Sequence, residues 1–156
     1  MKKVEILSIS RVKQDFILKG EKEYQKRLSK FVDLKLTDFN LSFPASMSKN
    51  DVMKQEGEYF FKHTSKDAKI ILLDEHGKKF TSQEFANFIK KQDVSSNTLL
   101  FAIGGAYGWH ESVKEKADML LSLSDFTFPY QLSRLIMVEQ LYRAYSIINN
   151  FPYHKE

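Results

Sequence analysis

Apolar residues recur along the chain with two spacings, and each spacing predicts one kind of secondary structure. Short β-prone runs, either alternating or continuous, predict strands at residues 4–9, 32–39, 68–73, 98–103 and 119–123. Apolar residues at helical spacing predict helices at residues 16–31, from 48 or 50 to 63, from 81 through 89, at 110–117 and from 129 to about 150. Strands that alternate with helices in this way are typical of an α/β protein, whose mostly parallel sheet carries helices on both faces.

The predicted strands differ in how much of their surface is expected to be buried. Residues 32–39 alternate between apolar and polar side chains, which is typical of a half-exposed strand near a sheet edge. The continuous apolar run Ala68–Leu73 predicts a central strand, and Asp74–Gly77 is expected to end it in a turn. No internal repeat or linker interrupts the pattern, so residues 1–156 are predicted to form a single domain.

Residues suited to helix ends support these boundaries. Thr81 and Glu84 have the spacing of a capping box, in which each side chain binds a backbone N–H group of the other residue. Pro129 suits the start of the last helix, because the missing N–H group of proline would have no partner there. Gly57 lies inside a predicted helix, where it costs roughly 1 kcal/mol relative to alanine. Close packing is the favoured reason for this glycine, and a ligand contact is the alternative.

Composition and charge narrow the class of protein. Of the 156 residues, 42% are hydrophobic and 28% are charged, as in a soluble globular domain. The net charge of +4 permits a polyanionic partner without requiring one. The lack of cysteine excludes disulfides, thiolate zinc sites and a cysteine nucleophile. The first residues lack the apolar core of a signal peptide and no apolar run could span a membrane, so we expect a cytoplasmic protein without a membrane partner.

Parallel sheets bind ligands beyond the carboxyl ends of their strands. Three predicted loops lie at such ends, at residues 73–77, 104–108 and 123–129. The second loop contains three of the six glycines in the chain, Gly104, Gly105 and Gly108. Glycine lets another group come close to the backbone. The spacing alone leaves two alternatives open, a ligand site and a tight turn without a ligand.

The glycine loop matches no common nucleotide-binding motif well. Its spacing is GGxxG instead of the GxGxxG of dinucleotide-binding proteins, and it follows the fourth predicted strand instead of the first. Asp125 lies twenty residues beyond Gly105, as a ribose-binding acid would, so an NAD enzyme stays a distant alternative. The chain lacks the GK[ST] of a Walker loop and the GxSxG of α/β-hydrolases.

The titratable side chains give a weaker signal. The four histidines show no HxxxH pairing, so no metal site is predicted. Tyr153, His154 and Lys155 place an aromatic ring, a titratable base and a cation side by side near the C-terminus. Tyr145 and Tyr153, near Arg143, could also stack on RNA bases, although core packing explains Tyr145 equally well.

Three motifs follow one another in a recognisable order: LLDEHG at residues 72–77, IGGAYG at 103–108 and SLSDFTFPYQLSRLIMVEQLYRAYSIINNFPYHKE at 122–156. Their order and spacing closely resemble those of the RlmH family, the ribosomal RNA large-subunit methyltransferases H, within the SPOUT superfamily of knotted methyltransferases. The resemblance covers essentially the whole chain, including VEILSIS near the start, the EYQKRL helix and KQEGE at 54–58. The C-terminal block is its most specific part.

The resemblance implies an S-adenosylmethionine-dependent enzyme that methylates N3 of pseudouridine 1915 in the 23S rRNA of the assembled 70S ribosome. It also implies a C-terminal segment threaded into a trefoil knot, an exception to the rule that chains are unknotted. A homodimer is implied as well, in which the tail of one protomer completes a site near the cofactor pocket of its partner. The apolar stripe of the last helix fits either a dimer face or the core. A non-catalytic RNA- or ribosome-binding protein with the same fold is the main alternative.

The resemblance further implies where the methyl donor binds. It would lie between the three loops, lined by Leu73, Gly104, Gly105, Leu123, Ser124, Asp125, Phe126, Thr127 and Phe128. Backbone polar groups in an apolar pocket suit the adenine edge, the ribose and the amino-acid end of such a ligand. A side chain at position 105 is expected to occupy the space of the donor.

The C-terminal tail would supply the chemistry in this family. Either His154 would take up the imide proton or Lys155 would stabilise the developing negative charge, while Tyr153 would order the tail. The family tail commonly reads YHR, so Lys155 keeps the charge of the arginine but loses its two-pronged geometry. Arg134 and Arg143, together with Lys155, are candidates for contacts with RNA, and the two arginines could instead form salt bridges across a dimer.

Overall fold

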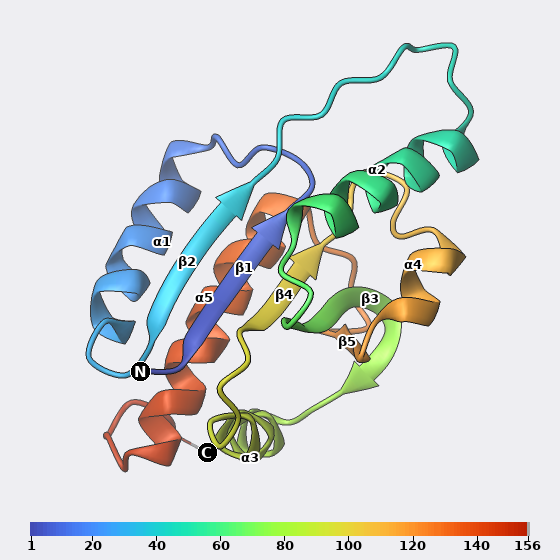
Figure 1. Ribbon diagram of the computed structural model, residues 1–156. Helices are drawn as coiled ribbons and strands as arrows, with labels where there is room; N and C mark the ends of the chain where they lie inside the picture. The colour runs from blue at the N-terminus through green and yellow to red at the C-terminus, as the bar shows by residue number, and fades with distance from the viewer. Residues whose placement is uncertain (156) are drawn as a thin grey trace.

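Helices and strands alternate strictly along the chain in the computed structural model, which describes residues 1–155 (Figure 1). The strands are β1 (Lys3–Ser8), β2 (Asp33–Asp38), β3 (Lys69–Lys79), β4 (Leu99–Ile103) and β5 (Met119–Ser122). The helices are α1 (Asp15–Leu28), α2 (Lys49–His63), α3 (Ser82–Gln92), α4 (Glu111–Lys116) and α5 (Tyr130–Ile148). This alternation confirms the α/β prediction.

The five strands form one sheet in the order β2-β1-β4-β3-β5, and every neighbouring pair is parallel. Strand β2 lies at one edge, as its alternating pattern predicted. Strand β3 lies inside the sheet between β4 and β5, as its continuous apolar run predicted. Because all strands point the same way, the loops that follow them meet along one edge of the sheet.

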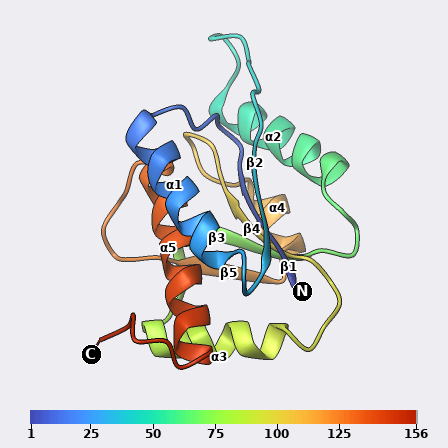
Figure 2. The same ribbon diagram turned by 90° about the vertical axis from the view of Figure 1, so that its left-hand side faces the viewer.

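Helices cover both faces of the sheet and bury a separate apolar layer on each. Figure 2 shows α1, α3 and α5 on one side and α2 with α4 on the other. Helix α5 packs against both α1 and α3, and its residues Met137, Val138 and Leu141 are fully buried. These parts of the apolar stripe therefore belong to the core of this chain. Within residues 1–155 no helix combines the length and hydropathy needed to cross a lipid bilayer.

Strand β3 continues to Lys79, so the prediction that Asp74–Gly77 ends the strand in a turn is wrong. The pairing with β5 shifts here, because Leu73 and Lys78 both lie opposite Leu121. The residues between them bulge out of the ladder, and β5 holds the chain in the sheet beyond the bulge. The polar composition of this segment thus marks a bulge that carries Asp74 to the edge where the loops meet.

The helix ends follow the predicted chemistry closely. Thr81 Oγ1 accepts a hydrogen bond from Glu84 N at 3.1 Å, and Glu84 Oε1 accepts one from Thr81 N at 2.8 Å, so the capping box is formed. Pro129 immediately precedes α5 as its N-cap residue. A side chain at Gly57 would overlap Val113 of α4, which identifies this glycine as a site of close packing between α2 and α4.

Candidate active site

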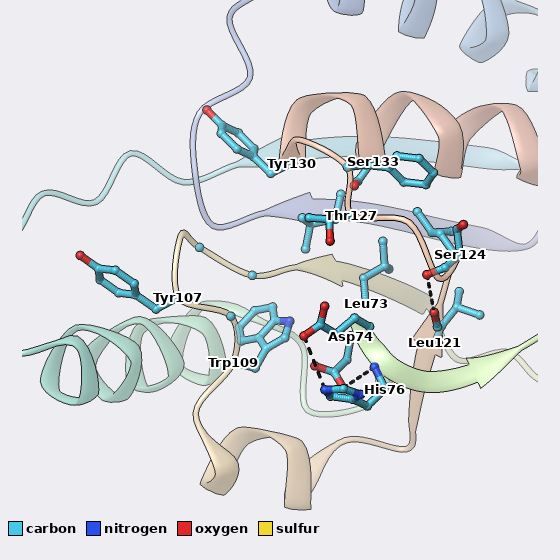
Figure 3. Close-up of a pocket in the computed structure, with 18 of the residues that line it drawn as sticks. Leu73, Asp74, His76, Tyr107, Trp109, Leu121, Ser124, Thr127, Tyr130 and Ser133 are labelled. Carbon is cyan, nitrogen blue, oxygen red and sulfur yellow. Dashed lines mark hydrogen bonds and ion pairs between the residues drawn. The ribbon is translucent and has the colours of Figure 1, made fainter.

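The three loops converge on one cavity of about 520 Å³ at the carboxyl ends of β3, β4 and β5 (Figure 3). The bulge of β3 forms one wall, the glycine loop after β4 forms a second, and the segment between β5 and α5 forms a third. Lys114 of α4 and the first turn of α5 complete it. The volume lies in the range of roughly 300–1,000 Å³ that is usual for small-molecule sites.

Most of the residues predicted to bind the methyl donor line this cavity. They are Leu73, Gly104, Gly105, Leu123, Ser124, Phe126, Thr127 and Phe128. Asp125 is the exception: its side chain is 84% exposed and pairs with Lys79 instead of facing the cavity. This orientation also removes the ribose-binding acid on which the NAD alternative depended.

The sequence reasoning missed several residues of the cavity wall, namely Asp74, Trp109, Lys114, Tyr130 and Ser133. Three of them had a usable signal. Trp109 directly follows the last glycine of the loop, and Tyr130 and Ser133 are three residues apart, so they share one face in the first turn of α5. Lys114 reaches the cavity only through the packing of α4, which periodicity does not reveal.

Trp109 presents an unsatisfied donor at the cavity wall. Its side chain is 5% exposed and packs on Phe60 with 5.1 Å between the ring centroids. Among the described residues nothing accepts a hydrogen bond from the indole Nε1. A buried donor without a partner costs about 1–3 kcal/mol. A ligand with a hydrogen-bond acceptor therefore fits this wall.

The same wall carries negative charge. Asp74 is largely buried, and its carboxylate lies 3.4 Å from the ammonium group of Lys114. His76 donates its backbone N–H to Asp74 Oδ2 at 3.2 Å, which fixes the carboxylate at the bulge. Glu75 is more exposed and lies at the same wall. The two carboxylates outnumber the single ammonium group of Lys114 at this wall, so a ligand with a cationic centre meets complementary net charge here.

The glycine loop is shaped by contact with α2. A side chain at Gly105 would overlap the carboxylate of Glu56, so the expectation that it would occupy the space of the donor is wrong. Glu56 is buried, and burial raises the pKa of its carboxyl group. Gly108 has a φ of +81°, which strongly favours glycine, and its N–H binds Gly105 O at 3.1 Å. The loop is therefore a tight turn as well as a cavity wall.

The predicted catalytic residues of the tail do not lie at the cavity of the same chain. Tyr153 packs against Tyr142 of α5, donates a hydrogen bond to Glu139 Oε1 at 3.1 Å and lies 3.1 Å from the hydroxyl of Tyr24. Burial, followed by the hydrogen bond with Tyr24 and the charge of Glu139, raises the pKa of Tyr153. Lys155 is exposed. Tyr153 thus anchors the tail along α5.

His154 contacts Arg143, a cationic residue of α5. Its Nδ1 lies 3.1 Å from Nη1 of Arg143, whose guanidinium also binds Glu139 Oε1 through Nη2 at 2.6 Å. A guanidinium can only donate hydrogen bonds, so Nδ1 must be the acceptor and the proton of neutral His154 sits on Nε2. Arg143 is partly exposed, so it remains able to contact a partner.

Arg134 lies in the interior, which corrects its assignment as an RNA-contacting residue. The side chain is 2% exposed and binds Glu21 through Nε and Nη2 and Asp38 through Nη1. These ion pairs lie within one chain, so they are not the salt bridges across a dimer that the sequence allowed. Among residues 1–155 no three His, Asp or Glu side chains lie close enough together to hold a metal ion.

A parallel sheet with a three-loop cavity at its carboxyl edge is the architecture of an α/β protein that binds a small-molecule ligand. Residues 2–154 match the family described as "Predicted SPOUT methyltransferase". Among similar proteins are three named "Ribosomal RNA large subunit methyltransferase H". That of Natranaerobius thermophilus is 40% identical over 97% of this chain and 99% of its own length. Those of Clostridium botulinum (strain Okra) and Acetivibrio thermocellus are 38% and 36% identical, over 97% and 98% of this chain and 99% of their own lengths. The chain therefore belongs to the SPOUT methyltransferases and, within them, to the family of ribosomal RNA large subunit methyltransferases H, which confirms the resemblance seen in its motifs.

Proposed function

We propose that this protein is an S-adenosylmethionine-dependent methyltransferase of large-subunit rRNA, and that it methylates N3 of pseudouridine 1915 on the assembled 70S ribosome in the cytoplasm. The observation that carries the proposal is the convergence of the three loops on one cavity, in a chain that belongs to a methyltransferase family. The rRNA named in the titles of its relatives supports the substrate class.

The cavity wall suits the methyl donor in shape and charge. S-adenosylmethionine, when bound, supplies an electrophilic methyl group on a sulfonium. Leu73 and Leu123 would provide apolar walls, while the carboxylate of Asp74 would attract the cationic centre. The N–H group of Trp109 would donate to an acceptor of the ligand. Holding the two reacting atoms in line accounts for much of the acceleration expected in such a transfer.

The nucleophile must lose a proton during the reaction, and the tail supplies the base in this proposal. His154 would take the N3 proton of the pseudouridine, so that the electron pair of N3 can form the new bond to the methyl carbon while the bond from that carbon to the sulfonium sulfur breaks and leaves a neutral thioether. His154 can do so only after its Nδ1 separates from Arg143, since Nε2 already carries a proton. Lys155 stabilises the negative charge that develops on the ring.

The position of the tail favours a homodimer. Tyr153 and His154 lie along α5, away from the cavity of their own chain, so they would serve the cavity of a second copy. We also propose that the C-terminal segment is threaded into the trefoil knot of the family. The homodimer is required by this mechanism, because the cavity of a monomer would lack the base.

A transfer assay tests the proposal. The purified protein, methyl-labelled S-adenosylmethionine and 70S ribosomes that lack the modification are combined, and the labelled nucleotide is mapped. We expect one labelled position per ribosome, at the pseudouridine, and much slower labelling of ribosomes that carry uridine there. Ribosome binding without any labelling would overturn the proposal and favour the non-catalytic RNA-binding alternative.

A further inference from the structure

The mouth of the cavity carries an aromatic side chain that the core does not use. Tyr107 occupies the tip of the glycine turn and is 48% exposed. The turn is held by the bond from Gly108 N to Gly105 O, so it presents the ring outward beyond the end of β4. Figure 3 shows Tyr107 in the glycine loop and Tyr130 at the start of α5 on the same side of the view, and both line the cavity. An exposed aromatic ring at this position can stack on a flat ligand group.

Cationic residues contact both tyrosines, Lys49 through its side chain and Arg11 through its backbone. The ammonium group of Lys49, the first residue of α2, lies 5.4 Å from the centre of the Tyr107 ring. The hydroxyl of Tyr130 donates to the backbone O of Arg11 at 2.7 Å. Gln131 Oε1 accepts hydrogen bonds from the backbone N of Lys13 at 3.0 Å. These two bonds tie the loop after β1 to the start of α5, so Arg11 and Lys13 are positioned next to the cavity mouth.

These three cations differ from the others near the cavity. Arg11, Lys13 and Lys49 are exposed, and within residues 1–155 none of them forms a salt bridge. Three other cations near this edge of the sheet have carboxylate partners. Lys79 pairs with Asp125, Lys114 with Asp74, and Arg134 with Glu21. Arg11, Lys13 and Lys49 are therefore cations without a carboxylate partner in the described part of the chain, on the side of the molecule where the cavity lies.

We propose that Arg11, Lys13, Lys49 and Tyr107, here called the basic rim, form the surface on which a single-stranded loop of the substrate RNA lies. The three cations bind phosphates, and Tyr107 stacks on a base next to the nucleotide that enters the cavity. Single-stranded RNA fits because its bases are free to stack and its phosphates match the charge of the basic rim. The inference rests on the proposed function and adds to it the RNA-binding residues of the N-terminal half.

The test removes the positive charge of the basic rim and compares the effect on RNA binding with that of removing the same charge elsewhere on the surface. The variant Arg11→Ala/Lys13→Ala/Lys49→Ala is matched with Lys66→Ala/Lys90→Ala/Lys91→Ala, whose exposed lysines lie near the opposite edge of the sheet. Binding to 70S ribosomes and to deproteinised large-subunit rRNA is measured over a series of salt concentrations. We expect the rim variant to bind RNA at least tenfold more weakly. The slope of the logarithm of the binding constant against the logarithm of the salt concentration should become smaller by about 2, because each of the three phosphate contacts contributes about 0.7. The control variant should keep most of its affinity.

Tyr107 is tested separately, because stacking needs the ring and not the hydroxyl. Tyr107→Ala should weaken RNA binding about tenfold, while Tyr107→Phe should bind as the unchanged protein does. Calorimetric titration with S-adenosylmethionine accompanies every variant. Normal donor binding together with weakened RNA binding supports the inference.

Three results would overturn the inference while leaving the methyltransferase proposal intact. The first is unchanged RNA binding by the rim variant, and the second is an equal loss of RNA affinity in both triple variants. The third is a changed oligomeric state with unchanged RNA affinity, which would assign the basic rim to contacts between copies of the chain. Failure of the unchanged protein to bind the methyl donor would instead count against the proposed function itself.

Discussion

Arg134 of α5 and Glu21 of α1 form a two-point ion pair in the protein interior. Nε of Arg134 lies 2.5 Å from Oε2 of Glu21, and Nη2 lies 2.9 Å from Oε1. Arg134 Nη1 also binds Asp38 Oδ1 and the backbone O of Thr37, at the end of β2. Because α5 begins at the cavity, this cluster fixes the cavity wall relative to α1 and to the sheet.

Removing one partner of this ion pair is expected to be costly. Arg134→Ala leaves the buried carboxylate of Glu21 without its partner, so the free energy of unfolding should fall by about 3–5 kcal/mol. The double variant Glu21→Leu/Arg134→Met should be more stable than Arg134→Ala, because it leaves no unpaired charge at the buried position 21, while Asp38, the other partner of Arg134, is partly exposed. Urea denaturation measures both. Arg27→Ala, which breaks an exposed pair with Glu23, is the control and should keep its transition midpoint. Equal midpoints for Arg134→Ala and Arg27→Ala would show that the buried pair does not hold α5 in place.

Glu56 makes stability depend on pH in a defined direction. Burial raises the pKa of its carboxyl group in the folded protein above the ordinary value of 4.5. The folded state therefore binds more protons than the unfolded state between these two pKa values, and ionisation of Glu56 lowers stability as pH rises through this window. Glu56→Gln removes that loss.

The stability difference between Glu56→Gln and the unchanged protein should accordingly shift in favour of the variant as pH rises from below 4.5 towards neutrality. Denaturation curves at several pH values give this difference directly. Glu58→Gln, a change at an exposed position of the same helix, serves as the control and should show no such trend. A difference that stays constant with pH would mean that Glu56 keeps an ordinary pKa in the folded protein.

His154 is expected to affect transfer and not donor binding. The residue lies outside the cavity of its own chain, so His154→Ala should bind S-adenosylmethionine as the unchanged protein does. Loss of the base should slow methyl transfer about 100-fold or more, the usual contribution of general base catalysis. Single-turnover assays on 70S ribosomes measure the rate, with His63→Ala of α2 as the control. If His154→Ala transfers methyl groups at the normal rate, another group takes the proton.

The sequence predicted the elements and the converging loops well, because local patterns determine them. Apolar spacing located the strands, and Thr81 with Glu84 marked a helix start that the structure shows in detail. The order of the parallel strands then brought the three loops together without further information. The bulge after Leu73 escaped prediction, because polar residues followed by glycine are typical of both a turn and a bulge.

Roles that depend on distant contacts could not be read from the sequence. Nothing in the neighbourhood of Arg134 shows that Glu21, more than a hundred residues earlier, lies against it. Gly105 was correctly placed at the cavity, but the group that excludes a side chain there is Glu56 of another element. The tail was assigned chemistry through family resemblance alone, and its position along α5 became visible only in three dimensions.

Binding of the methyl donor to the three-loop cavity is the central claim, and Trp109 offers a direct measurement of it. The chain contains one tryptophan, and this residue lines the cavity. Its emission is followed during a titration with S-adenosylmethionine, excited where adenine does not absorb, with NAD as the parallel ligand. We predict a saturable change in emission with S-adenosylmethionine and none with NAD. Emission that stays unchanged at saturating concentrations of S-adenosylmethionine would contradict the assignment of this cavity as the donor site.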